Sequence, residues 1–458
     1  MKYRELAIKT AEELCFGVSP NPVTTSRGLV IGGGLVYPEL NFTMPAIEVS
    51  MKNLPELRRQ YHEIAEGALT RALDLHSQGL ILEFETVIEM TLEPQIGIEL
   101  VKEMNQLCED FYQQHGLRSE IRLTPNDLRD FDRPPKPRTS KYMAPMMELF
   151  EQGALAGADL LSIESTGGKE ISDDALMMCD IRQFIFSQAV LGVRDMRMLW
   201  GKIVELANRI DKIPAGDTAC AFGNTAMVLA EKKFIPRIFA AIARVATVVR
   251  SLMAYEMGAK GPNKDCGYEG PFLKAIAGVP ISMEGKSAAC AHFSPLGNIT
   301  AACADLWSNE SVQNIKLLAG MAPTVSMEQL EFDVRLMNSA TKTGRESVRN
   351  LKKLFSDSDS FYDPQAFILT PENVILIAGE IVKGRTYLEA TTRGCLEAIR
   401  LIEDGVKNGQ LMNIENEVGW IEQIKASVQS IPTSEEQFVE EMLPIIDSSK
   451  IDLAEYGL

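Results

Sequence analysis

Apolar positions along the chain alternate between a helical period of about 3.6 residues and short continuous runs typical of buried strands. Residues 56–78 and 94–115 have the helical period, and each is followed by a strand-like run, "LILEFETVI" and "EIRLTP". The same alternation continues through "DLLSIE", "KIPAGDTACA" and "VPISMEG". Strands separated by helices of this length pair in parallel through right-handed crossovers. The pattern therefore predicts an α/β protein with a parallel sheet or barrel.

Six or so helix–strand units favour closure of the sheet into a (β/α)₈ TIM-type barrel with N-terminal and C-terminal helical extensions. We expect one barrel domain over residues 1–458, with a Gly/Pro-rich extension at about 1–53 and additional helices at about 380–458. A length of 458 residues is compatible with a single barrel that carries insertions. The 45% hydrophobic and 24% charged residues are the proportions of an ordinary globular protein.

Glycines predict where several elements end. Gly79 and Gly116 follow the first two helical segments, where a glycine commonly terminates a helix. The stretch "GLVIGGGLV" at 28–36 lacks the G-x-G-x-x-G spacing of a dinucleotide-binding loop. It predicts instead a turn or hairpin with positive φ angles.

The net charge of −17 argues against a protein that binds nucleic acid or an anionic membrane surface. The first residues lack an apolar signal core, and the apolar stretch 234–249 is interrupted by Pro236, Arg237 and Arg244. The eight cysteines are too dilute for a disulfide scaffold and form no C-x-x-C pair. We therefore expect a cytoplasmic protein.

Three residues with metal-ligating side chains come where strand-like runs pass into loops of small residues. These are Glu164 in "ADLLSIESTGG", Cys220 in "IPAGDTACAFGN" and Cys266 in "GPNKDCGYEG". In a barrel, the C-terminal ends of the strands face one shared pocket. Two thiolates and a carboxylate that meet there would form a zinc site with an open fourth position. Their spacing alone is equally compatible with two packing cysteines and a glutamate in an ion pair.

Other residues are weaker candidates. Glu83 and Glu85 alternate at the end of an early strand, where they could protonate a leaving group or form an ion-pair network. His292 could act as an acid or support the site, or could simply be a loop or core histidine. Cys290 and Cys303 lie in Ala-rich contexts that indicate packing, and we assign them no ligand role.

Four segments carry a resemblance to a known family. "LLSIESTGGKE", "IPAGDTACAFGNTAM", "GPNKDCGYEGPFLKAI" and the opening "YRELAIKTAEELCFGVSPNPV" resemble the methanol:corrinoid methyltransferase family. Its members are the zinc-containing subunits of the methanol-activating systems of methylotrophic methanogens and some anaerobic bacteria. The resemblance extends along the whole chain.

The resemblance implies that Glu164, Cys220 and Cys266 bind one zinc ion per chain. It also implies a separate corrinoid protein as partner and a homodimeric core of catalytic subunits within a heterotetramer. Zinc would act as a Lewis acid on the methanol oxygen while Co(I) of the partner's corrinoid takes the methyl group, giving methyl-Co(III) and water.

Two alternatives of other classes stay open at the level of sequence. One is a zinc hydrolase or lyase on the same barrel, acting without a corrinoid partner. The other is a corrinoid carrier or scaffold, which would need a cobalt-ligating histidine in a D-x-H-x-x-G pattern. None of the four histidines, His62, His76, His115 and His292, lies in such a pattern.

Overall fold

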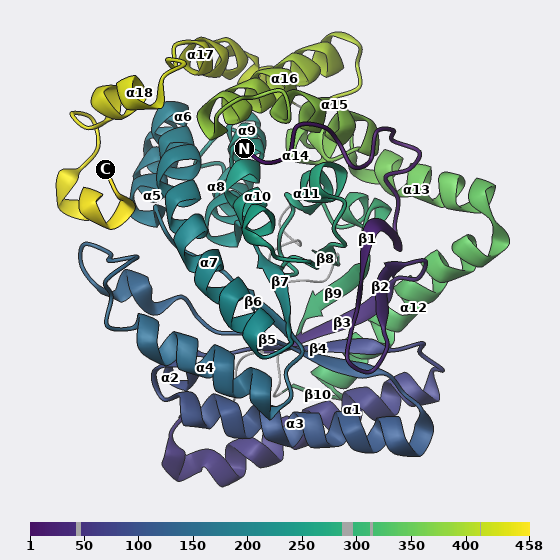
Figure 1. The fold of residues 1–458 in the computed structure, drawn as a ribbon. Coiled ribbons are helices and arrows are strands. Elements are labelled where there is room, and N and C mark those ends of the chain that lie inside the picture. The colour runs from purple at the N-terminus through teal and green to yellow at the C-terminus, as the bar shows by residue number, and fades with distance from the viewer. Residues whose placement is uncertain (43–46, 286–295, 312–314, 413) are drawn as a thin grey trace.

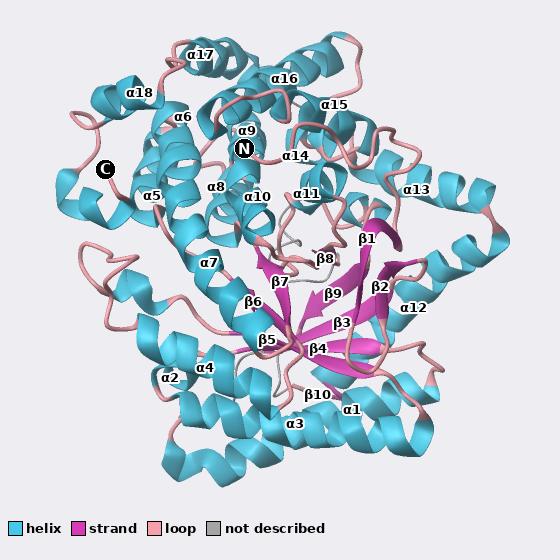
Figure 2. Cartoon of the chain, in the orientation of Figure 1, coloured by secondary structure: helices cyan, strands magenta, loops and turns pink. Residues whose placement is uncertain are grey.

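A computed structural model describes residues 1–42, 47–285, 296–311, 315–412 and 414–458. Its centre is a curled sheet of seven parallel strands in the order β7-β6-β5-β4-β3-β9-β8, with helices around it (Figures 1 and 2). This architecture confirms the predicted TIM-type α/β fold. The strands are β3 (Tyr37–Phe42), β4 (Leu80–Glu85), β5 (Ser119–Thr124), β6 (Leu160–Ile163), β7 (Ile213–Asp217), β8 (Ser282–Glu284) and β9 (Leu306–Glu310).

An extended segment, residues 260–263, lies against β7 and occupies the place of the missing barrel strand. The amide groups of Lys260 and Gly261 donate to carbonyls of β7, those of Pro214 and Ala215, each at 2.8 Å. The close approach requires Gly216 in β7, because a Cβ atom there would lie 2.9 Å from the Cα atom of the segment's last residue. The segment therefore extends the sheet beyond β7.

The side chain of Asn263 joins this segment to β8. Its Oδ1 accepts from the backbone amide of Ser282 at 3.0 Å, and its Nδ2 donates to the Ser282 carbonyl at 3.3 Å. The carboxamide thus replaces the backbone pairing that a regular strand would provide at this position. With this connection the seven strands and the segment form a closed ring of eight elements.

The helices pack outside the sheet and over its ends. Those up to residue 343 are α1 (Leu54–Asp74), α2 (Ile88–Leu92), α3 (Pro94–His115), α4 (Met143–Ala156), α5 (Lys169–Met178), α6 (Ile181–Ile185), α7 (Val193–Arg209), α8 (Thr225–Glu231), α9 (Arg237–Ala246), α10 (Val248–Met257), α11 (Gly270–Ala277) and α12 (Ala322–Thr343). Two π-helical segments, Phe186–Gly192 and Cys220–Asn224, lie before α7 and α8. By length and composition the stretch Arg237–Met257 could cross a membrane, but its most apolar window is entirely buried, so it is a core element of this fold.

The remaining helices follow α12 and run from the right-hand side of Figure 1 across its top to the upper left. They are α13 (Arg345–Asp359), α14 (Pro364–Ile368), α15 (Pro371–Ile381), α16 (Tyr387–Lys407), α17 (Val418–Gln429) and α18 (Glu435–Met442). The predicted C-terminal helical extension is therefore confirmed.

The N-terminal extension differs from the helical one that we expected. Residues 1–42 contain the antiparallel hairpin of β1 (Val18–Thr24) and β2 (Val30–Gly33), followed by β3, and no helix. The reason is their content of glycine and proline, which disfavour helices. Gly28, in the turn between β1 and β2, has a φ angle of 82°, and Gly32 and Gly34 have φ angles of 80° and 126°, in agreement with the hairpin with positive φ angles predicted for "GLVIGGGLV".

The hairpin packs against the strands of the barrel. Its apolar side chains form one cluster with residues near the beginnings of several strands; the members are Val23, Leu29, Ile31, Tyr37, Ile81, Leu160, Ile213, Ala215 and Leu306. The hairpin therefore covers the N-terminal ends of the strands and leaves the opposite ends for the functional site.

Of the two predicted helix ends, one is confirmed. Gly116 follows α3 with φ of 71° in the left-handed region. The other was wrong, because α1 already ends at Asp74, and Gly79 with φ of 150° directly precedes β4. The residues between, Leu75 to Gln78, form the turn that leads to the strand.

Candidate metal centre

The structure brings Glu164, Cys220 and Cys266 together at the C-terminal ends of the barrel strands. Glu164 directly follows β6, Cys220 begins the π-helical segment after β7, and Cys266 lies in the loop before α11. One potential ligand atom from each residue lies within 4.8 Å of the other two. The Cys266 sulfur is 3.0 Å from Oε1 of Glu164.

These separations fit a tetrahedral zinc ion. With Zn–S bonds of about 2.3 Å, two sulfur ligands of a tetrahedron lie about 3.8 Å apart, so shifts of about 1 Å would suffice for coordination. Two soft thiolates and one carboxylate are also the donor types that zinc prefers. The residues present therefore fit the metal that the sequence predicted.

Burial is the main influence on the pKa values of Cys266 and Glu164. It raises the pKa of the Cys266 thiol well above its usual value, although a contact with Cys220 opposes this. Burial also raises the pKa of Glu164, while the nearby Lys264 lowers it. A divalent cation would oppose the effect of burial, because it stabilises the deprotonated forms of its ligands.

A buried network fixes the loop that carries Glu164 relative to the end of β7. Asp217 accepts hydrogen bonds from Ser165 Oγ at 2.7 Å and from Trp200 Nε1 at 2.8 Å. Arg250 donates to Ser165 Oγ at 2.6 Å from the other side. Ser165 adjoins Glu164, and Asp217 precedes Cys220 by three residues. The network therefore fixes the positions of two of the three candidate ligands relative to each other.

Lys264 is a charged residue at the site that the sequence did not reveal. Its buried ammonium lies 2.7 Å from Asp265, 2.9 Å from Glu85, 3.1 Å from Glu164 and 3.7 Å from Glu83. Glu83 and Glu85 thus lie at the barrel mouth as predicted and form the ion-pair network considered as their alternative role. Lys264 connects this network to Glu164.

Glu83 differs from its neighbours in its protonation. Burial, and secondarily the charge of Asp265, raises its pKa well above the usual value. Oε1 accepts from Thr124 Oγ1 at 2.8 Å, while the buried Oε2 has no hydrogen-bond partner in the described structure. A raised pKa favours the neutral carboxylic acid, which suits this buried environment better than a carboxylate.

The other candidates have different outcomes. His292 and Cys290 lie outside the described residues. Cys303 is fully buried, as a packing residue would be, and its carbonyl accepts from Lys274.

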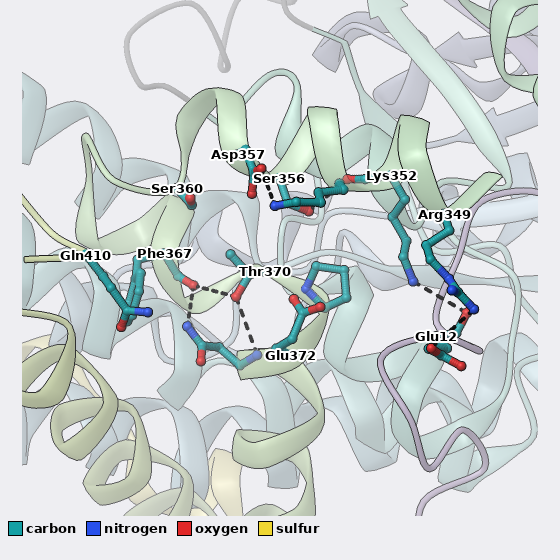
Figure 3. Close-up of a pocket in the computed structure, with 13 residues that line it drawn as sticks. Glu12, Arg349, Lys352, Ser356, Asp357, Ser360, Phe367, Thr370, Glu372 and Gln410 are labelled. Carbon is teal, nitrogen blue, oxygen red and sulfur yellow. Dashed lines mark hydrogen bonds and ion pairs between the residues drawn. The ribbon is translucent and has the colours of Figure 1, made fainter. Parts of the chain in front are cut away.

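A cavity of about 590 Å³ lies between the N-terminal segment and α13–α15, and none of the candidate ligands line it (Figure 3). Its basic side chains already have partners within the protein. Lys352 donates to the Glu12 carbonyl at 3.4 Å, Arg349 is 3.4 Å from the Glu12 carboxylate, and Lys353 pairs with Asp357. The three basic side chains that line the cavity are therefore held by contacts within the protein.

Comparisons with known proteins agree over the entire chain. The sequence model of the methanol-cobalamin methyltransferase B subunit family matches residues 1–457. The methanol–corrinoid protein co-methyltransferase of Methanosarcina barkeri (strain Fusaro / DSM 804) is 36% identical over 447 residues, which cover 96% of this chain and 95% of that protein.

A solved structure has the same fold. The crystal structure of the methanol:cobalamin methyltransferase complex MtaBC from Methanosarcina barkeri contains a chain that is 35% identical, with a TM-score of 0.95. The match covers 100% of this chain and 99% of that one. The chain therefore belongs to the methanol-cobalamin methyltransferase B subunit family.

Proposed function

We propose that this protein transfers the methyl group of methanol to the cobalt of a corrinoid carried by a partner protein. The observation that carries the proposal is the convergence of Glu164, Cys220 and Cys266 at the barrel mouth, in a chain that belongs to this family. A hydrolase or lyase would need the same metal but no corrinoid partner. Membership in a family of methyltransferases favours methyl transfer over these alternatives.

The three ligands would hold one zinc ion and leave its fourth position open to the barrel mouth. Zinc bound there would supply a Lewis acid for the alcohol oxygen, which is otherwise part of a poor leaving group. Cys220 is partly exposed whereas Cys266 is buried, so we propose that the substrate approaches from the side of Cys220. The rigid support behind Ser165 would keep the ligands oriented as methanol binds.

The acidic side chains around Lys264 are candidates for handling the proton that the departing oxygen needs. We propose that Glu83 retains a proton in the folded protein and that Lys264 holds Glu83, Glu85 and Glu164 in one group of close charge contacts. Either Glu83 or Glu85 could then supply a proton at the mouth. Protonation would convert a hydroxide leaving group into water.

We further propose a corrinoid protein as partner, a homodimeric core of catalytic chains within a heterotetramer, and a cytoplasmic location. The partner is inferred from the related MtaBC complex. Cytoplasmic location accords with the seven described cysteines, all of which are free thiols, because reducing compartments preserve thiols. Light scattering of the chain alone, compared with its mixture with the corrinoid protein, would test both assembly steps.

Replacement of Cys220 or Cys266 by alanine should abolish zinc binding. Wild-type protein should contain about one zinc per chain by elemental analysis, and each variant close to none, because two remaining ligands hold zinc poorly. Cys395→Ala is the matched control, since Cys395 is buried and does not belong to the cluster of Glu164, Cys220 and Cys266. Full zinc content in either ligand variant would refute the assignment.

A further inference from the structure

Asn224 connects the two segments that carry the cysteines. It ends the π-helical segment that Cys220 begins, and its side chain is 4% exposed. Nδ2 lies 3.4 Å from the Cys220 sulfur and 3.0 Å from the carbonyl oxygen of Cys266. Both neighbours are acceptors, so the amide group of Asn224 donates one hydrogen to each.

Arg244 fixes the direction in which the Asn224 carboxamide points. Its Nη1 lies 3.4 Å from Oδ1 of Asn224, and Nη2 donates to Gln365 Oε1 at 3.1 Å and to the Gly223 carbonyl at 3.3 Å. A guanidinium is only a donor, and thus the oxygen of the carboxamide must face it. The amide nitrogen is then necessarily directed at the Cys220 sulfur.

The charge of Arg244 is also unusual. Arg244 is 1% exposed and its guanidinium lies 5.3 Å from the centre of the Tyr268 ring, but within the described ranges of the chain it forms no ion pair with a carboxylate. Buried charges are costly unless they are compensated. Two thiolates and one carboxylate around a zinc ion carry one excess negative charge, which Arg244 faces through the carboxamide of Asn224.

We propose that Asn224, oriented by Arg244, is a positioning residue that stabilises the Cys220 thiolate and tunes the electron donation of its sulfur to the metal. The inference rests on the proposed zinc site. An N–H donor withdraws electron density from a thiolate, so it leaves the metal a stronger Lewis acid. It also lowers the cost of holding two anionic sulfurs at adjacent positions.

Two variants distinguish this role from simple packing. Asn224→Ala removes the donor. Asn224→Asp keeps the shape and gains an ion pair with Arg244, but it directs a carboxylate oxygen at the sulfur and at the Cys266 carbonyl. If Asn224 only supports the fold, Asn224→Asp should bind metal normally.

The test combines zinc affinity with the spectrum of the cobalt(II)-substituted protein. Competition with a chromophoric chelator should give zinc affinities 10- to 100-fold lower for both variants than for wild type. The thiolate-to-cobalt charge-transfer band should move to longer wavelength, because the sulfur has lost its hydrogen bond. Asn338→Ala is the matched control: Asn338 is a buried carboxamide with two hydrogen bonds to Val36, and its loss should leave band and affinity unchanged.

The spectrum of the wild type and the spectra of the variants distinguish a failure of the proposed metal site from a failure of the role of Asn224. A wild-type protein that binds cobalt with no thiolate charge-transfer band would overturn the metal site and this inference together. A normal wild-type band with unchanged position and affinity in Asn224→Asp would overturn the role of Asn224 alone. A band shift with weakened zinc binding in both variants, but not in Asn338→Ala, supports it.

Discussion

At the scale of single residues, the barrel mouth concentrates negative charge around one lysine. Glu83, Glu85, Glu164 and Asp265 all lie within 4.0 Å of the Lys264 ammonium. One cation cannot balance four buried or half-buried carboxylates, so at least one of them is expected to keep its proton. Glu83 is the best candidate because burial raises its pKa most clearly. The zinc ion would add the remaining positive charge.

Glu83→Gln should change how stability depends on pH. The folded-state pKa of Glu83 is raised, so between its usual pKa and the raised value the folded protein binds a proton that the unfolded chain has released. The contribution of protonated Glu83 to the free energy of unfolding is therefore fully present at low pH and is lost as the pH rises, by up to about 1.4 kcal/mol per pH unit. Glutamine cannot titrate. The free energy of unfolding of the variant, measured with urea from about pH 5 to about pH 8, should therefore depend less on pH than that of the wild type.

Glu89→Gln is the control for this experiment, since Glu89 is exposed on α2. It should retain the pH profile of the wild type. If the free energy of unfolding of Glu83→Gln falls with pH as steeply as that of the wild type, Glu83 is ionised in the folded protein over this range.

At the scale of elements, the ring closes through a side chain instead of an eighth regular strand. Asn263 links the segment beside β7 to β8 and lies three residues before Cys266. Asn263→Ala would leave the buried amide and carbonyl of Ser282 without these partners, at a cost of about 1–3 kcal/mol each. We expect a free energy of unfolding lower by about 2–5 kcal/mol, measured by urea denaturation, together with weaker zinc binding.

Asn350→Ala provides the comparison, because Asn350 is exposed on α13 and should tolerate the change. Equal stability of Asn263→Ala and Asn350→Ala would contradict the proposed closure of the ring.

The sequence predicted β4 to β7 because their apolar runs are recognisable, but it did not identify β3 and β9 as strands. Both strands carry polar side chains into the barrel. Glu39 in β3 accepts from Arg122 at 2.7 Å, and Ser308 in β9 donates to Asp265 at 2.9 Å. A polar barrel interior removes the apolar signal on which strand prediction depends.

The same contrast applies to the site. Glu164, Cys220 and Cys266 could be found because ligand-type residues followed recognisable strands and matched family motifs. Asn224 and Lys264 could not be assigned roles, since what suggests a role is contact with residues on other segments, with Cys266 in one case and with Glu83, Glu85 and Glu164 in the other. Such contacts leave no fixed spacing in the sequence.

At the scale of the whole molecule, the two ends of the barrel differ in structure and in the residues that they carry. The β1–β2 hairpin covers the N-terminal ends of the strands, while the candidate metal centre lies at their C-terminal ends. This division is typical of TIM barrels, in which one end supports stability and the other carries the chemistry. A partner that presents a corrinoid must therefore approach the mouth, where Cys220 is partly exposed.

The central claim is that this chain uses the Glu164–Cys220–Cys266 centre to transfer the methyl group of methanol to cobalt. The most direct measurement is the absorption spectrum of a Co(I) corrinoid protein mixed with this protein and methanol under strictly anaerobic conditions. Zinc-loaded wild-type protein should convert Co(I) to methyl-Co(III), whereas chelated protein and Cys220→Ala should leave Co(I) unchanged. Equal formation of methyl-Co(III) with and without zinc, or none with the zinc-loaded wild type, would contradict the account.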